Sequence, residues 1–231
     1  SIENKISFPY LLLLVSGGHS QYIIVRGLNN YKQIGTTIDD AVGEAFDKTA
    51  KILNLGYPGG PCVEKFSKLG NKNSFVLPQP IINRGGCNMS FAGLKTDVLR
   101  KSKNIKSDQD KYNLAASFQE TINKILRKKT EIAMLEFRQK TSNNSTSPFV
   151  VAGGVAANET IRKNLKDLSK KMNFKPIFPS KEFCGDNAAM IAWAGIQRYK
   201  KKLFNKKSEI VRSRWPLDSK APFLKGPGLK L

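Results

Sequence analysis

Two glycine pairs, each following a run of apolar residues, are the features of this sequence best suited to hold a charged ligand. Residues 11–15 lead into Gly17-Gly18, and residues 149–152 lead into Gly153-Gly154. Glycine has no Cβ and can adopt a positive φ, so another group can approach its backbone closely, and exposed N–H groups at such a turn can bind an anion. A tight hairpin without a ligand is the plainer interpretation of Gly17-Gly18 and remains open.

Polar side chains beside these turns add possible ligand contacts. Asn158 and Asp186 each precede a helical pattern, where capping of the helix is the alternative role for both. Asp47 could accept hydrogen bonds from a ligand, or it could form an ion pair with Lys51 four residues later. The imidazole of His19 could orient or polarise a carbonyl group, or it could be hydrogen-bonded within its own loop.

Composition limits the class of protein. The chain has 231 residues, of which 40% are apolar and 25% charged, as in a globular protein of one large or two small domains. No segment reaches the roughly 18 apolar residues needed to span a bilayer, and no basic segment precedes the first apolar run as in a signal peptide. The three cysteines form no CxxC pair, and there is one histidine. These features predict a cytoplasmic protein without disulfides or a membrane segment.

The net charge of +21 makes polyanion binding a serious hypothesis. The excess is mostly lysine and is spread over several segments, so composition bias is an alternative explanation. The basic residues between 124 and 129 lie beside the apolar stripe of an expected helix at 109–138. For these residues, a solvated helix face is favoured over an RNA contact.

Apolar runs and glycine turns alternate with helical patterns, which predicts an α/β domain with a mainly parallel or mixed sheet. The first strand lacks alternation and is expected to be buried on both faces. A helix at 38–53 is expected to be capped by Thr37 or Asp39. A helix at 188–199 is apolar nearly all round and should be deeply buried. Residues 1–204 are expected to form one lobe with flanking helices and a helical insertion at about 61–147, followed by a basic tail at 205–231.

Seven motifs together carry a family resemblance. They are LVSGGHSQ at 14–21, TTIDDAVGEAFDK at 36–48, GYPGGP at 56–61, SFAGLKT at 90–96, AGGVAAN at 152–158, CGDNAAM at 184–190 and RWPL at 214–217. Their order over nearly the whole chain resembles the TsaD family of tRNA adenosine threonylcarbamoyltransferases, once labelled glycoprotease-like. That resemblance implies the actin/Hsp70/sugar-kinase (ASKHA) fold.

The resemblance also implies an acyltransferase reaction. The family moves a threonylcarbamoyl group from threonylcarbamoyl-adenylate to the exocyclic amine of the adenosine beside the anticodon, in tRNAs that read codons beginning with A. It implies substrate binding by the backbone of the first glycine hairpin, by Asp47 and Gly60, and by Asn158. It implies a metal ligand at Asp186 and places His19 next to the substrate. The residues so assigned are Leu14, Val15, Ser16, Gly17, Gly18, His19, Asp47, Gly60, Asn158 and Asp186.

The metal site is where this sequence departs from the family pattern. The family binds iron or zinc with an HxxxH pair ahead of the glycine hairpin and with the late aspartate. This sequence contains no second histidine. We therefore expect the chain to be the C-terminal portion of a family member, without the N-terminal lobe. The remaining ligands of one divalent metal, iron rather than zinc, should then lie upstream, and the chain alone should have little activity.

The resemblance implies tRNA, threonylcarbamoyl-adenylate and helper subunits similar to TsaB and TsaE as partners. Two other functions remain open. One is a non-catalytic RNA-binding or scaffolding remnant, which the missing histidines favour. The other is a small-molecule kinase of the same fold, which Asp186 at a helix start and the RWPL motif disfavour.

Overall fold

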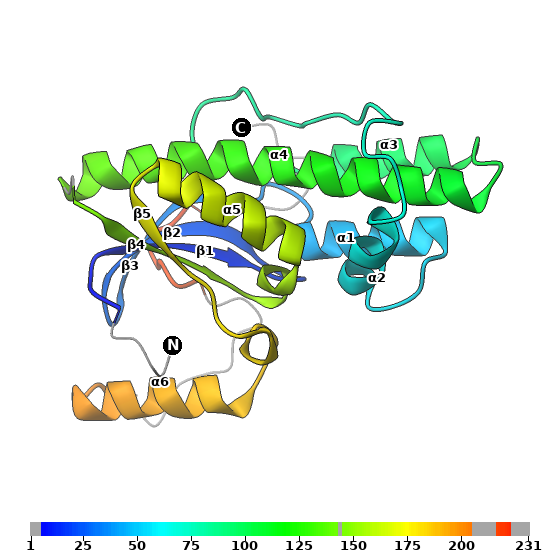
Figure 1. Cartoon of the computed structure of the whole chain (residues 1–231). Coiled ribbons are helices and arrows are strands. Elements are labelled where there is room, and N and C mark those ends of the chain that lie inside the picture. The colour runs from blue at the N-terminus through cyan, green and yellow to red at the C-terminus, as the bar shows by residue number, and fades with distance from the viewer. Residues whose placement is uncertain (1–5, 143–144, 205–215, 223–231) are drawn as a thin grey trace.

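The computed structural model describes residues 6–142, 145–204 and 216–222 (Figure 1). Its centre is a five-stranded sheet in the order β3-β2-β1-β4-β5. The first three strands form an antiparallel meander, whereas β4 is parallel to β1 and β5 is parallel to β4. The predicted mixed sheet is confirmed. The strands are β1 (Tyr10–Val15), β2 (Ser20–Gly27), β3 (Asn30–Thr36), β4 (Ser147–Ala152) and β5 (Phe174–Ile177).

Helices cover one face of this sheet, with the long helix α4 lying across it and α5 beside α4 (Figure 1). A single turn, η1 (Gly154–Ala157), joins β4 to α5, and another, η2 (Lys181–Phe183), precedes the last helix. The α-helices are α1 (Val42–Leu53), α2 (Gly59–Ser67), α3 (Ala92–Ser102), α4 (Asp108–Thr141), α5 (Glu159–Lys171) and α6 (Ala188–Lys200).

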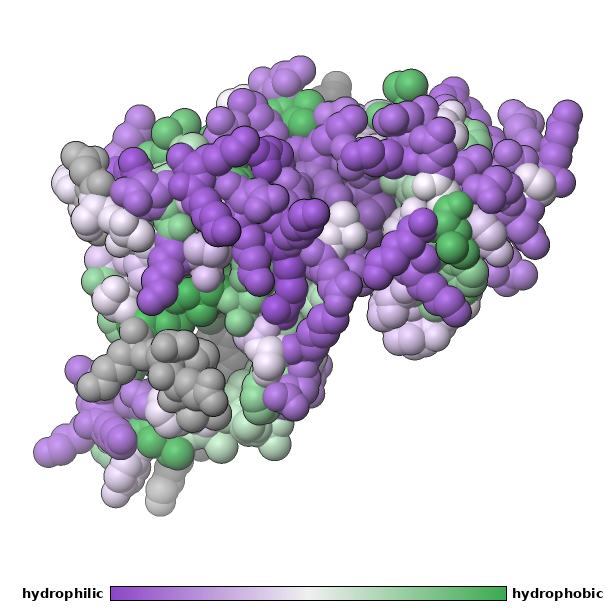
Figure 2. Space-filling view, in the orientation of Figure 1, coloured by the Kyte–Doolittle hydropathy of each residue, from purple (hydrophilic) through white to green (hydrophobic). Residues whose placement is uncertain are grey.

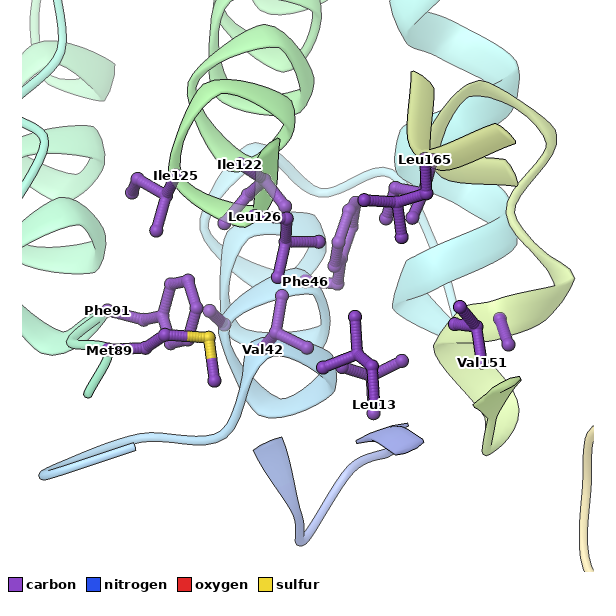
Figure 3. Packing of buried hydrophobic residues seen from close by; sticks show 14 of the residues in the cluster. Leu13, Val42, Phe46, Met89, Phe91, Ile122, Ile125, Leu126, Val151 and Leu165 are labelled. Atoms are coloured by element: carbon purple, nitrogen blue, oxygen red, sulfur yellow. The ribbon is translucent and has the colours of Figure 1, made fainter. Parts of the chain in front are cut away.

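The core lies between the sheet and these helices. Leu13 of β1 and Val151 of β4 face Val42 and Phe46 of α1 and the inner side of α4 (Figure 3). The ring of Phe46 packs edge-on against Phe118, with 5.2 Å between ring centroids. Burying a large apolar side chain stabilises a fold by about 1.5–3 kcal/mol, so this layer holds α1 and α4 firmly on the sheet.

The expectation that β1 is buried on both faces is wrong. Leu11, Leu13 and Val15 are fully buried, but Leu12 and Leu14 are only partly covered. Alternate residues of a strand point to opposite faces, and the described helices α1, α4 and α5 pack on one face only. The apolar run therefore identifies a strand without revealing how far its second face is covered.

The expectation for the last helix is also wrong. None of the residues of α6 is buried, and Ile191 and Tyr199 are 67% and 72% exposed. The helix stands apart from the sheet and from the other helices (Figure 1). Apolarity predicts that a helix needs a covering surface, but it does not say where that surface lies.

Two further expectations about side chains are corrected. The helix expected at 38–53 begins at Val42, and neither Thr37 nor Asp39 caps it, because the N-cap residue is Ala41. Lys129 is fully buried instead of solvated, and its Nζ donates to the carbonyls of Arg84 (2.8 Å) and Gly86 (3.2 Å). Burial lowers the pKa of Lys129, and this side chain fixes the loop that precedes α3.

Residues 216–222 return to the edge of the sheet. The buried carboxylate of Asp218 accepts a hydrogen bond from the amide of Gln33 in β3 at 2.9 Å, which satisfies one donor of an edge strand. Of the RWPL motif, Pro216 and Leu217 are described, whereas Arg214 and Trp215 lie outside the described residues. So do residues 205–215 and 223–231 of the expected basic tail. No helix in the described part of the chain is long and apolar enough to cross a membrane.

Candidate functional site

The first glycine hairpin joins β1 to β2 and is held by the side chain of Ser16. The Oγ of Ser16 accepts hydrogen bonds from the amides of Gly18 (3.3 Å) and His19 (3.0 Å). The amide of Ser16 donates to the carbonyl of His19 at 2.8 Å. Neither Gly17 nor Gly18 has a positive φ, and a Cβ added at either would meet no atom within 4 Å. The hairpin tip thus presents bare backbone to open space, with two of its N–H groups already bound by a hydroxyl.

Helix α1 begins directly against this hairpin. The amide of Gly43 donates to the carbonyl of Ser16 at 3.2 Å, and a Cβ at Gly43 would lie 2.6 Å from the same oxygen. The Oγ of Ser20 accepts a hydrogen bond from the amide of Val42 at 2.9 Å. Only glycine allows this approach, so Gly43 fixes the distance between the hairpin and the start of α1.

The second glycine pair lies beside the first at the same edge of the sheet. Strands β1 and β4 are parallel neighbours, so their carboxyl ends meet there. Gly153 has φ +100°, and a Cβ at this position would collide with the carbonyl oxygen of Val15. A Cβ at Gly154 would meet nothing within 4 Å. One glycine of the pair packs tightly, and the next faces open space.

The GYPGGP motif, which contacts Asp47, also has one tightly packed glycine followed by one that faces open space. The Oδ1 of Asp47 accepts a hydrogen bond from the amide of Gly59 at 2.9 Å, and a Cβ at Gly59 would collide with the Cα of Asp47. A Cβ at Gly60 would again meet nothing within 4 Å. The ion pair between Asp47 and Lys51 is not formed, because Asp47 serves instead as an acceptor at the first turn of α2.

Asn158 is buried and caps α5. Its Oδ1 accepts a hydrogen bond from the amide of Ile161 at 3.0 Å, and its Nδ2 donates to the Oε1 of Gln119 in α4 at 2.9 Å. The capping role considered for Asn158 is therefore present. The Oε1 of Glu64 in α2 accepts from the amide of Glu159 at 2.7 Å, which ties α2 to the same helix start.

These contacts connect the glycine turns in a ring. The hairpin contacts α1 at Gly43, α1 contacts α2 through Asp47, α2 contacts α5 through Glu64, and the turn before α5 contacts β1 through Gly153. The structure thus brings together the residues that the sequence proposed for substrate binding. The side chain of Val15 is part of the core, so this residue can offer only its backbone to a ligand.

Asp186 is attached to this ring through Arg162. The Nη2 of Arg162 donates to the carbonyl of Pro179 at 2.6 Å and lies 3.2 Å from the Sγ of Cys184, and its Nε donates to the carbonyl of Ala156. One side chain of α5 therefore holds the segment before Asp186 against the second glycine turn. Asp186 is exposed and does not cap α6, because the N-cap residue is Asn187.

The described residues fit only part of a metal site. Among them, no group of three or more His, Cys, Asp and Glu side chains is close enough to hold a metal ion. Asp186 offers one exposed carboxylate, and the imidazole of His19 is also exposed. Asp186 can therefore be one metal ligand, and the described residues do not complete the set around it.

Sequence reasoning missed Glu64, Gln119 and Arg162, because a helical polar residue carries no local sign of a partner on another helix. It also missed the role of Asp39, which accepts hydrogen bonds from Ser90 Oγ and from the amides of Phe91 (2.7 Å) and Ala92 (3.2 Å) at the start of α3. Ser90, two residues before the start of α3, was the only available signal.

Ion pairs beside the ring connect α1 to α3. The Oδ2 of Asp40 lies 3.0 Å from the Nζ of Lys48 and 3.2 Å from the Nζ of Lys95, and Glu44 also pairs with Lys48. Burial alone would raise the pKa of Asp40, but the hydrogen bonds from both lysines outweigh it and lower that pKa. Glu44 and Lys95 are thus part of a structural network.

Comparison with known proteins agrees with the motifs. Residues 1–193 match the family model described as "TsaD: tRNA N6-adenosine threonylcarbamoyltransferase". The chain is 56% identical over 230 residues to a protein of that name from Pelagibacter ubique, which aligns with 100% of the chain. It is 49% identical over 219 residues to a namesake from Rickettsia rickettsii and 47% identical over 230 residues to one from Rhizobium meliloti, which align with 94% and 98% of the chain.

The chain spans 64% of the length of each of these relatives. The family match covers most of the chain, and the mixed sheet with flanking helices is the α/β architecture expected of the family's ASKHA-like fold. The chain belongs to the TsaD family of tRNA N6-adenosine threonylcarbamoyltransferases.

Proposed function

We propose that the full-length protein transfers a threonylcarbamoyl group from threonylcarbamoyl-adenylate to the exocyclic amine of the adenosine beside the anticodon, in tRNAs that read codons beginning with A. The observation that carries this proposal is the ring of glycine turns at the carboxyl edge of β1 and β4. Gly17, Gly18, Gly60 and Gly154 leave open space where a Cβ would stand. Relatives named for this activity align with nearly the whole chain.

In this proposal the adenylate lies between the first hairpin and the turn before Asn158. Backbone N–H groups of the hairpin bind its anionic part, and the open glycines allow its close approach. The amide of Gly17 makes no hydrogen bond to another described residue and is free to donate. The hydroxyl of Ser16 can still donate one hydrogen bond while it accepts those of Gly18 and His19.

Asp47 and Asn158 keep structural partners in this site. The Oδ2 of Asp47 remains available to a ribose hydroxyl while its Oδ1 holds Gly59. Asn158 uses both ends of its amide within the protein, so we propose that it supports the nucleotide mainly by fixing the turn. His19 has an exposed imidazole, and in this proposal it orients the carbamoyl carbonyl once substrate is bound.

Asp186 is the proposed ligand of one divalent metal, iron rather than zinc, together with histidines from a preceding HxxxH segment. Such an ion, when bound, supplies Lewis-acid activation of a carbonyl. We also propose cytoplasmic action and helper subunits similar to TsaB and TsaE. Reading the coding sequence ahead of residue 1 tests the histidine pair directly, and a sequence without it would favour a non-catalytic RNA-binding protein.

The decisive experiment is a transfer assay with the full-length protein, its helper subunits, threonylcarbamoyl-adenylate and an unmodified tRNA transcript. Modified adenosine is measured by mass spectrometry of the digested tRNA. The matched variants are Gly60→Val, which fills open space at the proposed ligand site, and Gly85→Val, which fills open space in a distant loop.

We expect Gly60→Val to lower adenylate binding and transfer at least about tenfold, with little change in thermal unfolding. Gly85→Val should leave adenylate binding and transfer near the wild-type values. Failure of the wild type to modify tRNA under these conditions, with the helper subunits active on a control enzyme, would contradict the proposal. Phosphoryl transfer from ATP to a small molecule would instead support the kinase alternative.

A further inference from the structure

A polar groove runs between α4 and α5 on the face of the molecule that is mostly hydrophilic (Figure 2). Its volume is about 310 Å³, and its walls are residues of α4 and α5 together with Lys72. Asn164 of α5 links the two helices: its Nδ2 donates to the carbonyl of Asn123 at 3.0 Å, and its Oδ1 accepts from Arg127 at 3.0 Å. These bonds keep the two helices apart at a fixed spacing and give the groove a defined shape.

The groove carries an excess of positive charge. Four basic residues line it, Lys72, Lys124, Arg127 and Lys163, against the two acidic residues Glu120 and Asp167. Glu120 pairs with Lys72 (3.4 Å) and with Lys124 (4.0 Å). Within the described residues, Arg127 and Lys163 have no carboxylate within 4.0 Å, so their charges remain available to a ligand.

The groove also contains an unsatisfied acceptor. Asn123 is buried, and its amide oxygen has no hydrogen-bond partner among the described residues. This oxygen has almost no exposed surface, so the cations, and not Asn123, are what the groove offers to a ligand. A ligand that brings phosphate oxygens to these cations therefore matches this surface.

The groove begins close to the candidate site on both helices. Gln119 of α4 accepts the hydrogen bond of Asn158, and Glu120 and Asn123, which line the groove, follow within one helical turn. On α5, Thr160 lies two residues after Asn158 and begins the opposite wall. A nucleic-acid chain bound in the groove would therefore lie close to the candidate site.

We infer that the α4–α5 groove binds the sugar-phosphate backbone of the tRNA substrate, with Lys124, Arg127 and Lys163 contacting phosphates. This inference rests on the proposed function, because it takes tRNA as the substrate. Repeated phosphates at the spacing of a nucleic-acid chain suit basic side chains spread along two helices, whereas a single small anion needs convergent donors at one point.

The test measures binding of the full-length protein to an unmodified tRNA transcript over a series of salt concentrations. The groove variant is Lys124→Gln/Lys163→Gln, which removes two charges without touching the Arg127–Asn164 bonds. The control is Lys103→Gln/Lys106→Gln, which removes two exposed lysines between α3 and α4, outside the groove. Both pairs change the net charge equally, and thermal unfolding checks that both variants are folded.

We expect the groove variant to raise the Kd at least about fivefold and to reduce the slope of log K against log salt by roughly two. The control should change the Kd less than about twofold. Equal effects of the two variants on Kd and slope would overturn the inference, because they would mean that only the overall charge matters.

A transfer assay on the same proteins separates this inference from the proposed function. The groove variant should raise the KM for tRNA and leave kcat and the KM for threonylcarbamoyl-adenylate near wild type. If the wild type transfers the group but the groove variant binds tRNA as tightly as the wild type, the groove inference is wrong and the proposed function stands. If the wild type does not transfer the group although tRNA binding depends on the groove, the proposed reaction is wrong and the groove inference stands.

Discussion

The carboxylate of Asp47 in α1 accepts a hydrogen bond from the amide of Gly59 at the start of α2, with 2.9 Å between Oδ1 and N. The family resemblance assigns Asp47 to substrate binding, yet one of its oxygens is already part of the fold. Charged acceptors at a helix start are stabilising because they satisfy an amide that has no partner inside the helix. Any contact between Asp47 and a ligand must therefore leave its hydrogen bond to Gly59 in place.

Replacing Asp47 separates the two roles. Asp47→Ala should lower the free energy of unfolding by about 1–2 kcal/mol, because the amide of Gly59 loses its acceptor. Asp47→Asn keeps an amide oxygen at that place and should restore most of the stability. Urea denaturation measures both values. If substrate binding needs the second carboxylate oxygen, Asp47→Asn will bind threonylcarbamoyl-adenylate as weakly as Asp47→Ala, and wild-type affinity in Asp47→Asn would contradict that role.

The glycine pair after β4 offers a matched test of packing. Gly153→Ala should destabilise the protein by about 3 kcal/mol, because the new Cβ meets the carbonyl of Val15 and φ is +100°. Gly154→Ala points into open space and should change stability by less than about 0.5 kcal/mol. Equal losses in chemical denaturation would show that the tight contact between β1 and the second turn is absent in solution.

Arg162 should protect a cysteine. Cys184 is buried beside the guanidinium, which also holds the carbonyls of Ala156 and Pro179. Arg162→Ala should release this segment and increase the rate at which iodoacetamide modifies Cys184 by at least about tenfold.

Two comparisons make that measurement specific. Lys166→Ala removes the other cation over the ring of Phe178 and should leave the rate at Cys184 unchanged. Cys62 is partly exposed and serves as an internal reference for the reagent. Modification is located by peptide mass spectrometry, and an unchanged rate in Arg162→Ala would mean that Arg162 does not hold the segment before Asp186.

The lowered pKa of Asp40 predicts that the stability of the protein depends on pH. Lys48 and Lys95 lower its pKa in the folded state, so the folded protein binds this proton less readily than the unfolded chain. The stability that Asp40 contributes is therefore present above its unfolded pKa and is lost as the pH falls through the lower folded pKa. Asp40→Asn removes this pH-dependent contribution to stability.

The free energy of unfolding of wild type should exceed that of Asp40→Asn at about pH 6, and the difference should shrink towards about pH 3. Chemical denaturation at both pH values measures it. Glu131→Gln, which breaks an exposed pair with Lys128, should give a difference below about 0.5 kcal/mol at both. A difference for Asp40→Asn that does not depend on pH would contradict the lowered pKa.

Local patterns in the sequence were enough to predict the order of strands and helices. The long helix expected at 109–138 is observed at Asp108–Thr141, and the last helix expected at 188–199 is observed at Ala188–Lys200. The glycine turns and the family were also recognisable from sequence. Side-chain periodicity and turn residues act over a few positions, so they can be read without knowledge of distant partners.

The tertiary structure alone decided the partners of the polar groups and the exposure of the apolar ones. Asp39 bonds to residues 51–53 positions away, and Asn158 bonds to Gln119 across 39 positions. Lys129 looked solvated but is buried, and α6 looked buried but is exposed. Hydrogen bonds and burial depend on which elements meet in space, and the sequence around one residue does not encode its neighbour on another helix.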